Sequence, residues 1–373
     1  MLTRHSIIAA QILFSSVLLA QDKINSTIPV LYLPQGYVFE SLSSTGFYNA
    51  VNSHVANLGG GNPAALTDYR KLALGVAYQL ETSPQTGWMS FEQSRVQNLY
   101  PQAAGLVVPF RAFRFGGGFS QRYNSLLDFG KLPETTPEQP DGTGNYIKSS
   151  KSEVLCCYSA IVTYSFQDCL APGNILSIGL TGGLNHLNLK QNIGELRLHE
   201  NFLTLSWTFG IHYNDGNKVF IGLTYLRAPE FDDSFFYEGE RIRVKDKMPD
   251  KLHFGIGYRP HPAVNIAVDL VNVYWHQRTR ASNPQTNYAD IAGNLQVKLT
   301  QRLALTGGFL ASGCRLSSYL TPFDNNIYGL YLLGGMNWRL RHFDLDLVYG
   351  DSTENSGAWR QQKIGKVAIG YYL

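Results

Sequence analysis

The sequence predicts an all-β fold, a 14-stranded antiparallel transmembrane β-barrel with an N-terminal plug inside its lumen. Three observations predict it. From residue 70 onward apolar residues alternate with small or polar ones, most alternating segments reach the roughly 9 to 11 residues that cross a bilayer at a tilt, and long connections alternate with short ones. These features favour a closed barrel, which leaves no unpaired strand edge in lipid.

The alternation has the two-residue period of a strand with two different faces. Large apolar residues stand at every second position of residues 72–80, 203–213 and 343–349, and the positions between them are mostly small or polar. A soluble β-sandwich alternates in the same way, so the period alone leaves both folds open. Segment length favours the barrel, because strands of soluble proteins average only about 5 to 6 residues.

Fourteen strands follow from this pattern, and the connections between them are alternately long and short. The predicted strands are 71–80, 103–110, 113–122, 153–166, 174–189, 198–213, 218–228, 250–259, 263–277, 288–299, 303–312, 327–338, 343–350 and 363–373. Short periplasmic turns and longer external loops are typical of outer-membrane barrels. Residues 87–98 could extend the first hairpin or form a separate strand; we assign them to the first external loop, because a fifteenth strand would break the even count.

Composition excludes several classes of protein. The chain has 373 residues, of which 44% are hydrophobic and 16% charged, and its net charge is +3. After residue 20 no apolar run reaches the roughly 18 to 20 residues of a membrane-spanning helix. The apolar fraction is too high for disorder, and the small net charge does not suggest a nucleic-acid partner.

The N-terminus has the order of features of a secretory signal peptide. Arg4 precedes an apolar stretch that runs from Ile7 to Ala20, and the mature chain is expected to start near Gln21. We therefore divide the chain into a signal peptide (1–20), a plug segment (21–69) and a transmembrane barrel (70–373). The expected location is the bacterial outer membrane, with its lipids and lipopolysaccharide around a monomer.

Sequence motifs of enzymes and metal sites are absent. No nucleophile elbow, zinc-protease motif or phosphate-binding loop occurs, so no catalytic residue, cofactor or metal ligand is predicted. The four cysteines lack a metal spacing. A disulfide between Cys314 and either Cys156 or Cys157 is one open possibility.

Residues 21–69 lack the strand alternation. Ser44 could cap a short helix with Phe47 and Val51 on one face, ending at residues 59–61, which are three glycines. The segment is too apolar for a solvated tail, and a barrel of this size has room inside. We therefore expect a plug within the lumen.

Three short stretches resemble the FadL/TodX family of outer-membrane transporters of long-chain fatty acids and other hydrophobic compounds. They are GGGNPAAL at 59–66, GLVVPFRAFRFGGGFSQRYN at 105–124 and PDKLHFGIGYRP at 249–260. The first looks like the family's hatch motif, here Asn62, Pro63 and Ala64. The resemblance implies a hatch-blocked barrel that releases its ligand laterally at a kinked third strand.

The sequence offers a candidate for that kink. Gly116, Gly117 and Gly118 lie in the third predicted strand, where missing side chains permit a bulge. The same glycines could instead allow close packing of the plug against the wall, and the sequence leaves both interpretations open.

Candidate ligand-binding residues fall in three places. Phe47 and Val51 lie in the plug segment, and Arg114 and Arg122 face inward by parity, where they could pair with a ligand carboxylate or with acidic residues of the lumen. The fourth external loop, 229–249, has an aromatic cluster that could collect apolar ligand or pack over the barrel mouth. Its candidates are Phe231, Phe235 and Phe236.

The predicted function is passive uptake of a hydrophobic small molecule, such as a long-chain fatty acid, without catalysis. One alternative is a protein-binding component of a secretion system, as in FadL-like barrels of the PorV type. A barrel with a structural or adhesive role is the other.

Overall fold

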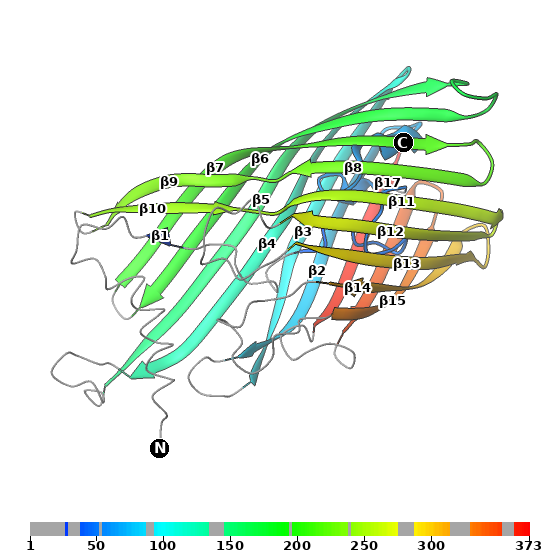
Figure 1. Cartoon of the computed structure of the whole chain (residues 1–373). Coiled ribbons are helices and arrows are strands. Elements are labelled where there is room, and N and C mark those ends of the chain that lie inside the picture. The colour runs from blue at the N-terminus through cyan, green and yellow to red at the C-terminus, as the bar shows by residue number, and fades with distance from the viewer. Residues whose placement is uncertain are drawn as a thin grey trace.

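The computed structural model describes residues 27–28, 38–51, 54–86, 93–133, 145–193, 196–237, 240–274, 287–313, 329–352 and 362–373. Fourteen antiparallel strands form one closed barrel in chain order (Figure 1), which confirms the predicted fold class. They are β2 (Ala73–Thr86), β3 (Gln93–Phe110), β4 (Phe113–Pro133), β5 (Tyr146–Gln167), β6 (Ile175–Ile193), β7 (Leu196–Asn214), β8 (Val219–Arg227), β11 (Asp250–His261), β12 (Val264–Tyr274), β13 (Tyr288–Lys298), β14 (Leu303–Ser312), β15 (Gly329–Arg339), β16 (Phe343–Asp351) and β17 (Lys363–Tyr372). The barrel closes where β17 pairs with β2.

Each predicted strand has its counterpart, but β2 to β7 extend further outward than the sequence indicated. Gln93 to Asn98 belong to β3, so the assignment of residues 87–98 wholly to a loop was wrong, and the first hairpin is longer. Parts of 123–152 likewise belong to β4 and β5. Polar residues and glycines weaken the alternation there, while cross-strand pairing still supports the strands.

The fourth external loop has structure of its own, which the sequence analysis did not predict. Its strands β9 (Glu230–Tyr237) and β10 (Glu240–Lys247) form a hairpin, and β1 (Thr27–Ile28) pairs in parallel with β10. The hairpin continues from β8 on the side of the long connections, so the chain is in contact with this external loop before it enters the barrel.

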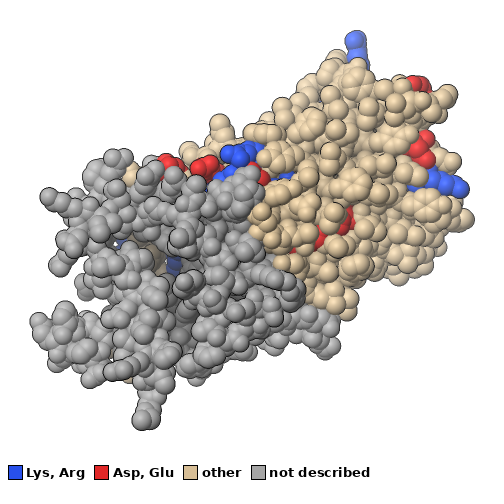
Figure 2. Space-filling view, in the orientation of Figure 1, with Lys and Arg blue, Asp and Glu red and all other residues tan. Residues whose placement is uncertain are grey.

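The outside of the barrel is an apolar belt. Along β2, Val76 and Tyr78 are 49% and 54% exposed, whereas the alternate residues Ala77 and Gln79 are buried. The same alternation recurs on the other strands, and Figure 2 shows a broad surface with few charged atoms. Such a belt is the surface that a transmembrane barrel turns toward lipid. Among the described residues, no helix is both long and apolar enough to cross a membrane.

The described parts of residues 38–72, here called the lumen segment, contact the inward faces of many strands. Ser44 reaches Asp346 of β16, Tyr48 reaches Asp290 of β13, and Val51 accepts a bond from His212 of β7. Hydrophobic clusters combine this segment with the wall; one of them joins Val55, Leu58 and Leu66 to wall residues such as Val107 and Ile161. The segment therefore supplies much of the core inside the barrel.

The local structure of the lumen segment differs from the predicted helix. Residues 44–51 are irregular, and two short 3₁₀ helices follow, η2 (Val55–Asn57) and η3 (Pro63–Asp68). Ser44 caps no helix, because none follows it in the described residues 44–51; its backbone N–H donates to the Asp346 carboxylate, and His54 caps η2. Contacts with the wall outweigh the weak helical pattern of so short a segment.

Two predictions fall outside the described residues. The signal peptide, 1–20, is one, and the pairing of Cys314 is the other.

Candidate functional site

The barrel wall has an irregular position at Arg122. The ladder between β3 and β4 runs from the Phe110–Phe113 pair to Ala103–Ser120, where its register ends among the described residues. Beyond it β3 continues along β2, and β4 continues along β5 after a register shift between Gln121 and Tyr123. Among the described residues, β3 and β4 are therefore not paired with each other beyond Ser120.

The part of the wall where the β3–β4 ladder ends lies within the apolar belt. Leu99 of β3 is 68% exposed and pairs with Leu80 of β2, which is also exposed. On β4, Leu126 faces outward as well. The end of the β3–β4 ladder is therefore at membrane depth rather than above it.

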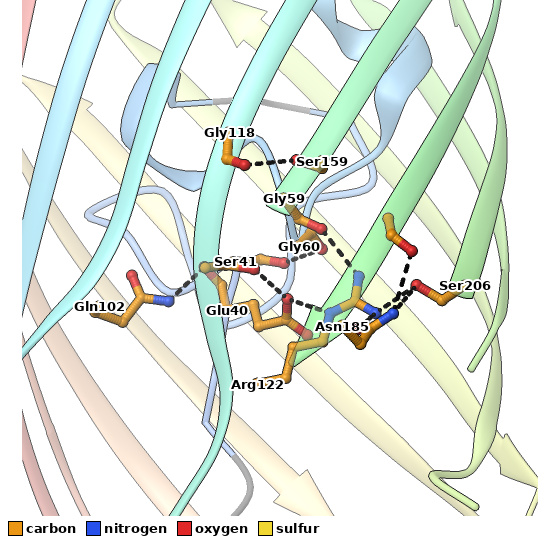
Figure 3. Close-up of polar contacts among 12 residues, drawn as sticks. Glu40, Ser41, Gly59, Gly60, Gln102, Gly118, Arg122, Ser159, Asn185 and Ser206 are labelled. Carbon is orange, nitrogen blue, oxygen red and sulfur yellow. Dashed lines mark hydrogen bonds and ion pairs between the residues drawn. The ribbon is translucent and has the colours of Figure 1, made fainter. Parts of the chain in front are cut away.

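Arg122 is the bulged residue at this point, and its side chain is buried and points into the lumen (Figure 3). Its guanidinium donates to Glu40 of the lumen segment at 3.2 Å, to Asn185 of β6 at 3.0 Å and to Ser206 of β7 at 2.9 Å. Its backbone carbonyl accepts from Val38 N–H of the lumen segment at 3.1 Å. Arg122 therefore ties the lumen segment to three strands.

Glu40 completes this polar junction. Its carboxylate also accepts from Ser120 of β4, and its backbone carbonyl accepts from Gln102 of β3. The Glu40 side chain is only 10% exposed, so the buried guanidinium has a buried counter-charge. A buried cation without such a partner would be strongly unfavourable.

A cavity of about 100 Å³ adjoins the junction, between the lumen segment and the wall. Part of its lining is aromatic: Phe39 and Tyr48 from the lumen segment, Tyr331 from β15 and His253 from β11. Phe39 packs edge-on against Tyr331 with ring centroids 5.4 Å apart, and Tyr48 does so against His253 at 5.7 Å. Edge-to-face contacts of this kind are the favoured geometry of aromatic pairs.

The polar lining of the cavity is balanced in charge. Two basic residues, Arg122 and Lys251, and two acidic ones, Glu40 and Asp290, are part of its lining. Asp290 accepts from the Tyr48 hydroxyl at 2.7 Å, and the His253 ring lies 2.8 Å from Asp269. The site can therefore hold an apolar ligand without leaving a large uncompensated charge beside it.

The predicted hatch motif lies below this cavity and is anchored to the wall. The Asn62 side chain caps η3 by accepting from Ala64 N–H, and it donates to the carbonyls of Ala50 and Ile211. The Pro63 carbonyl accepts from Thr163 of β5 at 2.6 Å. Ala64 is fully buried. The three residues thus hold the lumen segment against strands on one side of the barrel.

The glycines of β4 do not form the bulge. Gly116, Gly117 and Gly118 pair regularly with both β3 and β5, and the irregularity lies at Arg122 instead. A methyl group at Gly116 would lie 3.3 Å from Leu66, and one at Gly118 would lie 3.6 Å from the backbone of Gly59. Gly116 therefore packs closely against the lumen segment, whereas the atoms nearest to a methyl group at Gly118 belong to the wall, the Ser159 hydroxyl at 3.1 Å and the Ala104 carbonyl at 3.2 Å. A role of these glycines in lateral release stays a prediction.

The other candidate residues do not line the cavity. Arg114 lies toward the periplasmic turns and donates to the carbonyls of Tyr69 and Arg111. Phe47 and Val51 are buried in hydrophobic clusters of the lumen segment and wall. Phe231 is buried in a cluster with Tyr123 and Leu155, over the external end of the barrel.

Phe235 and Phe236 lie on β9, and their side chains are outside the described part of the chain. Whether they contact ligand stays a prediction.

Sequence reasoning missed Glu40, Phe39, Tyr48, Lys251 and Tyr331. The alternation of inward and outward residues along β11 and β15 could have placed Lys251 and Tyr331 on the inward face. Phe39, Glu40 and Tyr48 belong to the lumen segment, which has no repeating pattern that would single them out. Among the described residues, no group of three His, Cys, Asp or Glu side chains could hold a metal ion.

Comparison with known proteins identifies the fold. No family model and no curated protein matches the chain. Among solved structures, a deltaS2 mutant of the TodX monoaromatic hydrocarbon channel has a TM-score of 0.68 at 13% identity, covering 90% of this chain and 100% of that one. This chain has the FadL-type barrel fold.

Two further structures agree. The toluene transporter TbuX of Ralstonia pickettii matches at TM-score 0.62 and 12% identity, covering 90% of this chain and 99% of that one. A FadL homologue of Pseudomonas aeruginosa matches at TM-score 0.56 and 11% identity, covering 85% and 94%. A FadL-type barrel with an apolar belt is an outer-membrane architecture, so the predicted location is confirmed.

Proposed function

We propose that the chain is a passive outer-membrane channel for hydrophobic molecules about the size of one aromatic ring. The observation that carries the proposal is the aromatic-lined cavity of about 100 Å³ beside the end of the β3–β4 ladder. The solved structures with this fold include the TodX monoaromatic hydrocarbon channel and the toluene transporter TbuX.

Size favours a single ring over a long chain. A dry, apolar cavity of about 150 Å³ takes up benzene, and this cavity of about 100 Å³ is smaller still. Seating even one ring requires small shifts of Phe39 or Tyr48. A long-chain fatty acid would require the lumen segment to move much further, so the proposed ligand is a single-ring molecule.

The route we propose has two steps. Ligand enters from the external loops and rests in the cavity, because the lumen segment occupies the barrel below. It then leaves sideways between β3 and β4 beyond Ser120, where their ladder has ended within the apolar belt. An apolar molecule moving this way never has to cross the polar periplasmic half of the lumen.

In this route the Arg122–Glu40 ion pair keeps the exit closed, because it joins the bulge of β4 to the lumen segment beside the cavity. A shift of Glu40 would break the ion pair between the bulged residue and the lumen segment. Breaking a buried ion pair by removing one partner costs roughly 3 to 5 kcal/mol, so this junction normally stays closed.

Uptake of radiolabelled toluene and oleate by cells expressing the chain tests the proposal. Val271→Trp fills the cavity from β12, and Val268→Trp is the matched control, since Val268 is on the same strand but 52% exposed on the belt. We expect wild type and the control to take up toluene faster than cells without the protein, and Val271→Trp to lose that gain.

Two outcomes would contradict the proposal. One is equal toluene uptake by Val271→Trp and the control. The other is a tightly co-purifying protein with no gain in toluene uptake, which would favour the secretion-component alternative.

A further inference from the structure

A second cavity lies at the opposite end of the lumen segment, facing the short turns of the barrel. Its volume is about 820 Å³, and it is bounded by residues 43–45 and 68–71 of the lumen segment and by the turns that follow β13 and β15. Seven basic side chains line it: Arg70, Lys71, Arg259, Lys298, Arg302, Arg339 and Arg341. Figure 2 shows basic side chains on the rim at this end of the molecule.

The positive charge is local to this cavity. The whole chain carries a net charge of only +3, whereas this one cavity has seven basic residues and three acidic ones. Asp346 is occupied by the backbone N–H of Ser44, and Asp344 accepts from Asn337. Asp344 also forms an ion pair with Arg339, at 3.7 Å. Seven basic and three acidic side chains leave an excess of four positive charges in this cavity.

The cations are held close together and face solvent. Lys298 lines the cavity together with Arg259 and Arg339. The Arg259 guanidinium is held over the Phe220 ring, 4.7 Å from its centroid, and cannot easily turn away. Arg302 and Arg341 are exposed on neighbouring turns. A concave site lined by one sign of charge raises the local concentration of counter-ions of the opposite sign.

We infer that this cavity binds a soluble anion carrying two or more phosphate or carboxylate groups from the periplasmic side. Arginine matches such groups with paired hydrogen bonds, and the volume falls within the roughly 300 to 1,000 Å³ of small-molecule pockets. The inference does not depend on the proposed channel function, because the lumen segment separates this cavity from the aromatic one.

Calorimetric titration of the full-length protein in detergent tests the inference. The probes are tripolyphosphate and citrate, with acetate at equal ionic strength as the monovalent comparison. The variant is Arg302→Gln with Arg341→Gln. The matched control is Arg111→Gln with Lys218→Gln, because these residues lie in turns of the same rim but outside the cavity lining.

We expect the multivalent probes to bind wild type and the control alike, and acetate to bind neither. The cavity variant should bind at least about tenfold more weakly, since it lacks two guanidinium groups that would hydrogen-bond the anion, and added salt should weaken binding to wild type. Equal loss in the two double variants, or binding only when phosphatidylglycerol is added to the detergent, would overturn the inference. Retained heat-modifiable migration on gels shows that each variant is folded.

Discussion

At the scale of single residues, the inward glycines allow the lumen segment to approach the wall backbone. A methyl group at Gly105 would lie 2.0 Å from the carbonyl oxygen of Val55, and one at Gly222 would lie 2.1 Å from that of Ala50. Gly75 and Gly179 meet backbone atoms of the same segment at 2.7 and 2.5 Å. Side chains at these positions would push the segment away from the wall, which accounts for part of the chain's high glycine content.

Gly210→Ala should therefore destabilise the protein. Its new methyl group would lie 2.1 Å from the Asn62 side-chain oxygen, and overpacking of this kind costs about 1 to 3 kcal/mol. Gly182→Ala is the control, since nothing lies within 4 Å of its methyl position. Chemical unfolding in detergent measures both variants. Equal midpoints for the two would contradict this account of the glycines.

His54 predicts a pH dependence. Burial lowers the pKa of this imidazole below its usual value of 6.5, and the nearby carboxylates of Asp346 and Asp344 only partly offset the effect. The unfolded chain therefore binds the proton more readily than the folded one, so this residue reduces stability as pH falls below about 6.5. Unfolding midpoints of wild type and His54→Gln from about pH 8 to pH 5 measure the effect. The variant should show the shallower acid-side decline, and an identical decline would rule out His54 as its source.

At the scale of elements, β4 and η3 do most to shape the candidate site. The bulge of β4 re-aims Arg122 and ends the pairing with β3, as bulges next to functional sites commonly do. The short helix η3 contacts β5, β6 and β7 and so seats the lumen segment on the side of the barrel that Arg122 also reaches. The position of the cavity follows from these two elements together.

Asn62 should be the most sensitive position of η3. Asn62→Ala removes the cap, worth roughly 0.5 to 2 kcal/mol, and leaves the carbonyls of Ala50 and Ile211 without their side-chain donor. Asn62→Ser retains a capping oxygen but cannot reach both carbonyls, so it should recover only part of the loss. Thermal unfolding of the three proteins gives the order wild type, Ser, Ala. Full recovery by serine would show that the wall contacts contribute little.

At the scale of the whole molecule, barrel and lumen segment form one folding unit. Four of the hydrophobic clusters inside the barrel combine residues of both parts. The segment is also bonded to strands around the circumference, from β4 through β12 to β17. Removing it would expose apolar wall residues to water in the lumen.

Deletion of residues 21–69 should therefore lower the thermal midpoint and raise the conductance of the protein in planar bilayers. Both effects have the same cause, the loss of side chains that fill the lumen. A deletion variant with the wild-type midpoint and no added conductance would contradict a structural and blocking role. The wild-type chain reconstituted in parallel is the control.

Sequence reasoning reached the architecture more readily than the site. The alternation of Leu203, Leu205 and Trp207 with small or polar residues depends only on neighbours in the chain, and the structure confirms their outward direction. Glu40 and Arg122, by contrast, meet across 82 residues, and Ser44 and Asp346 across 302. No local pattern encodes such pairs.

The sequence by itself determined that this chain is a closed barrel of 14 antiparallel strands with an apolar exterior, because strand periodicity and connection length are properties of contiguous residues. The tertiary structure alone decided where the β3–β4 ladder ends, which aromatic rings surround the upper cavity and where basic residues gather below. Those features depend on register, on one bulged residue and on the path of an irregular segment, all of which are set by contacts between residues distant in the chain.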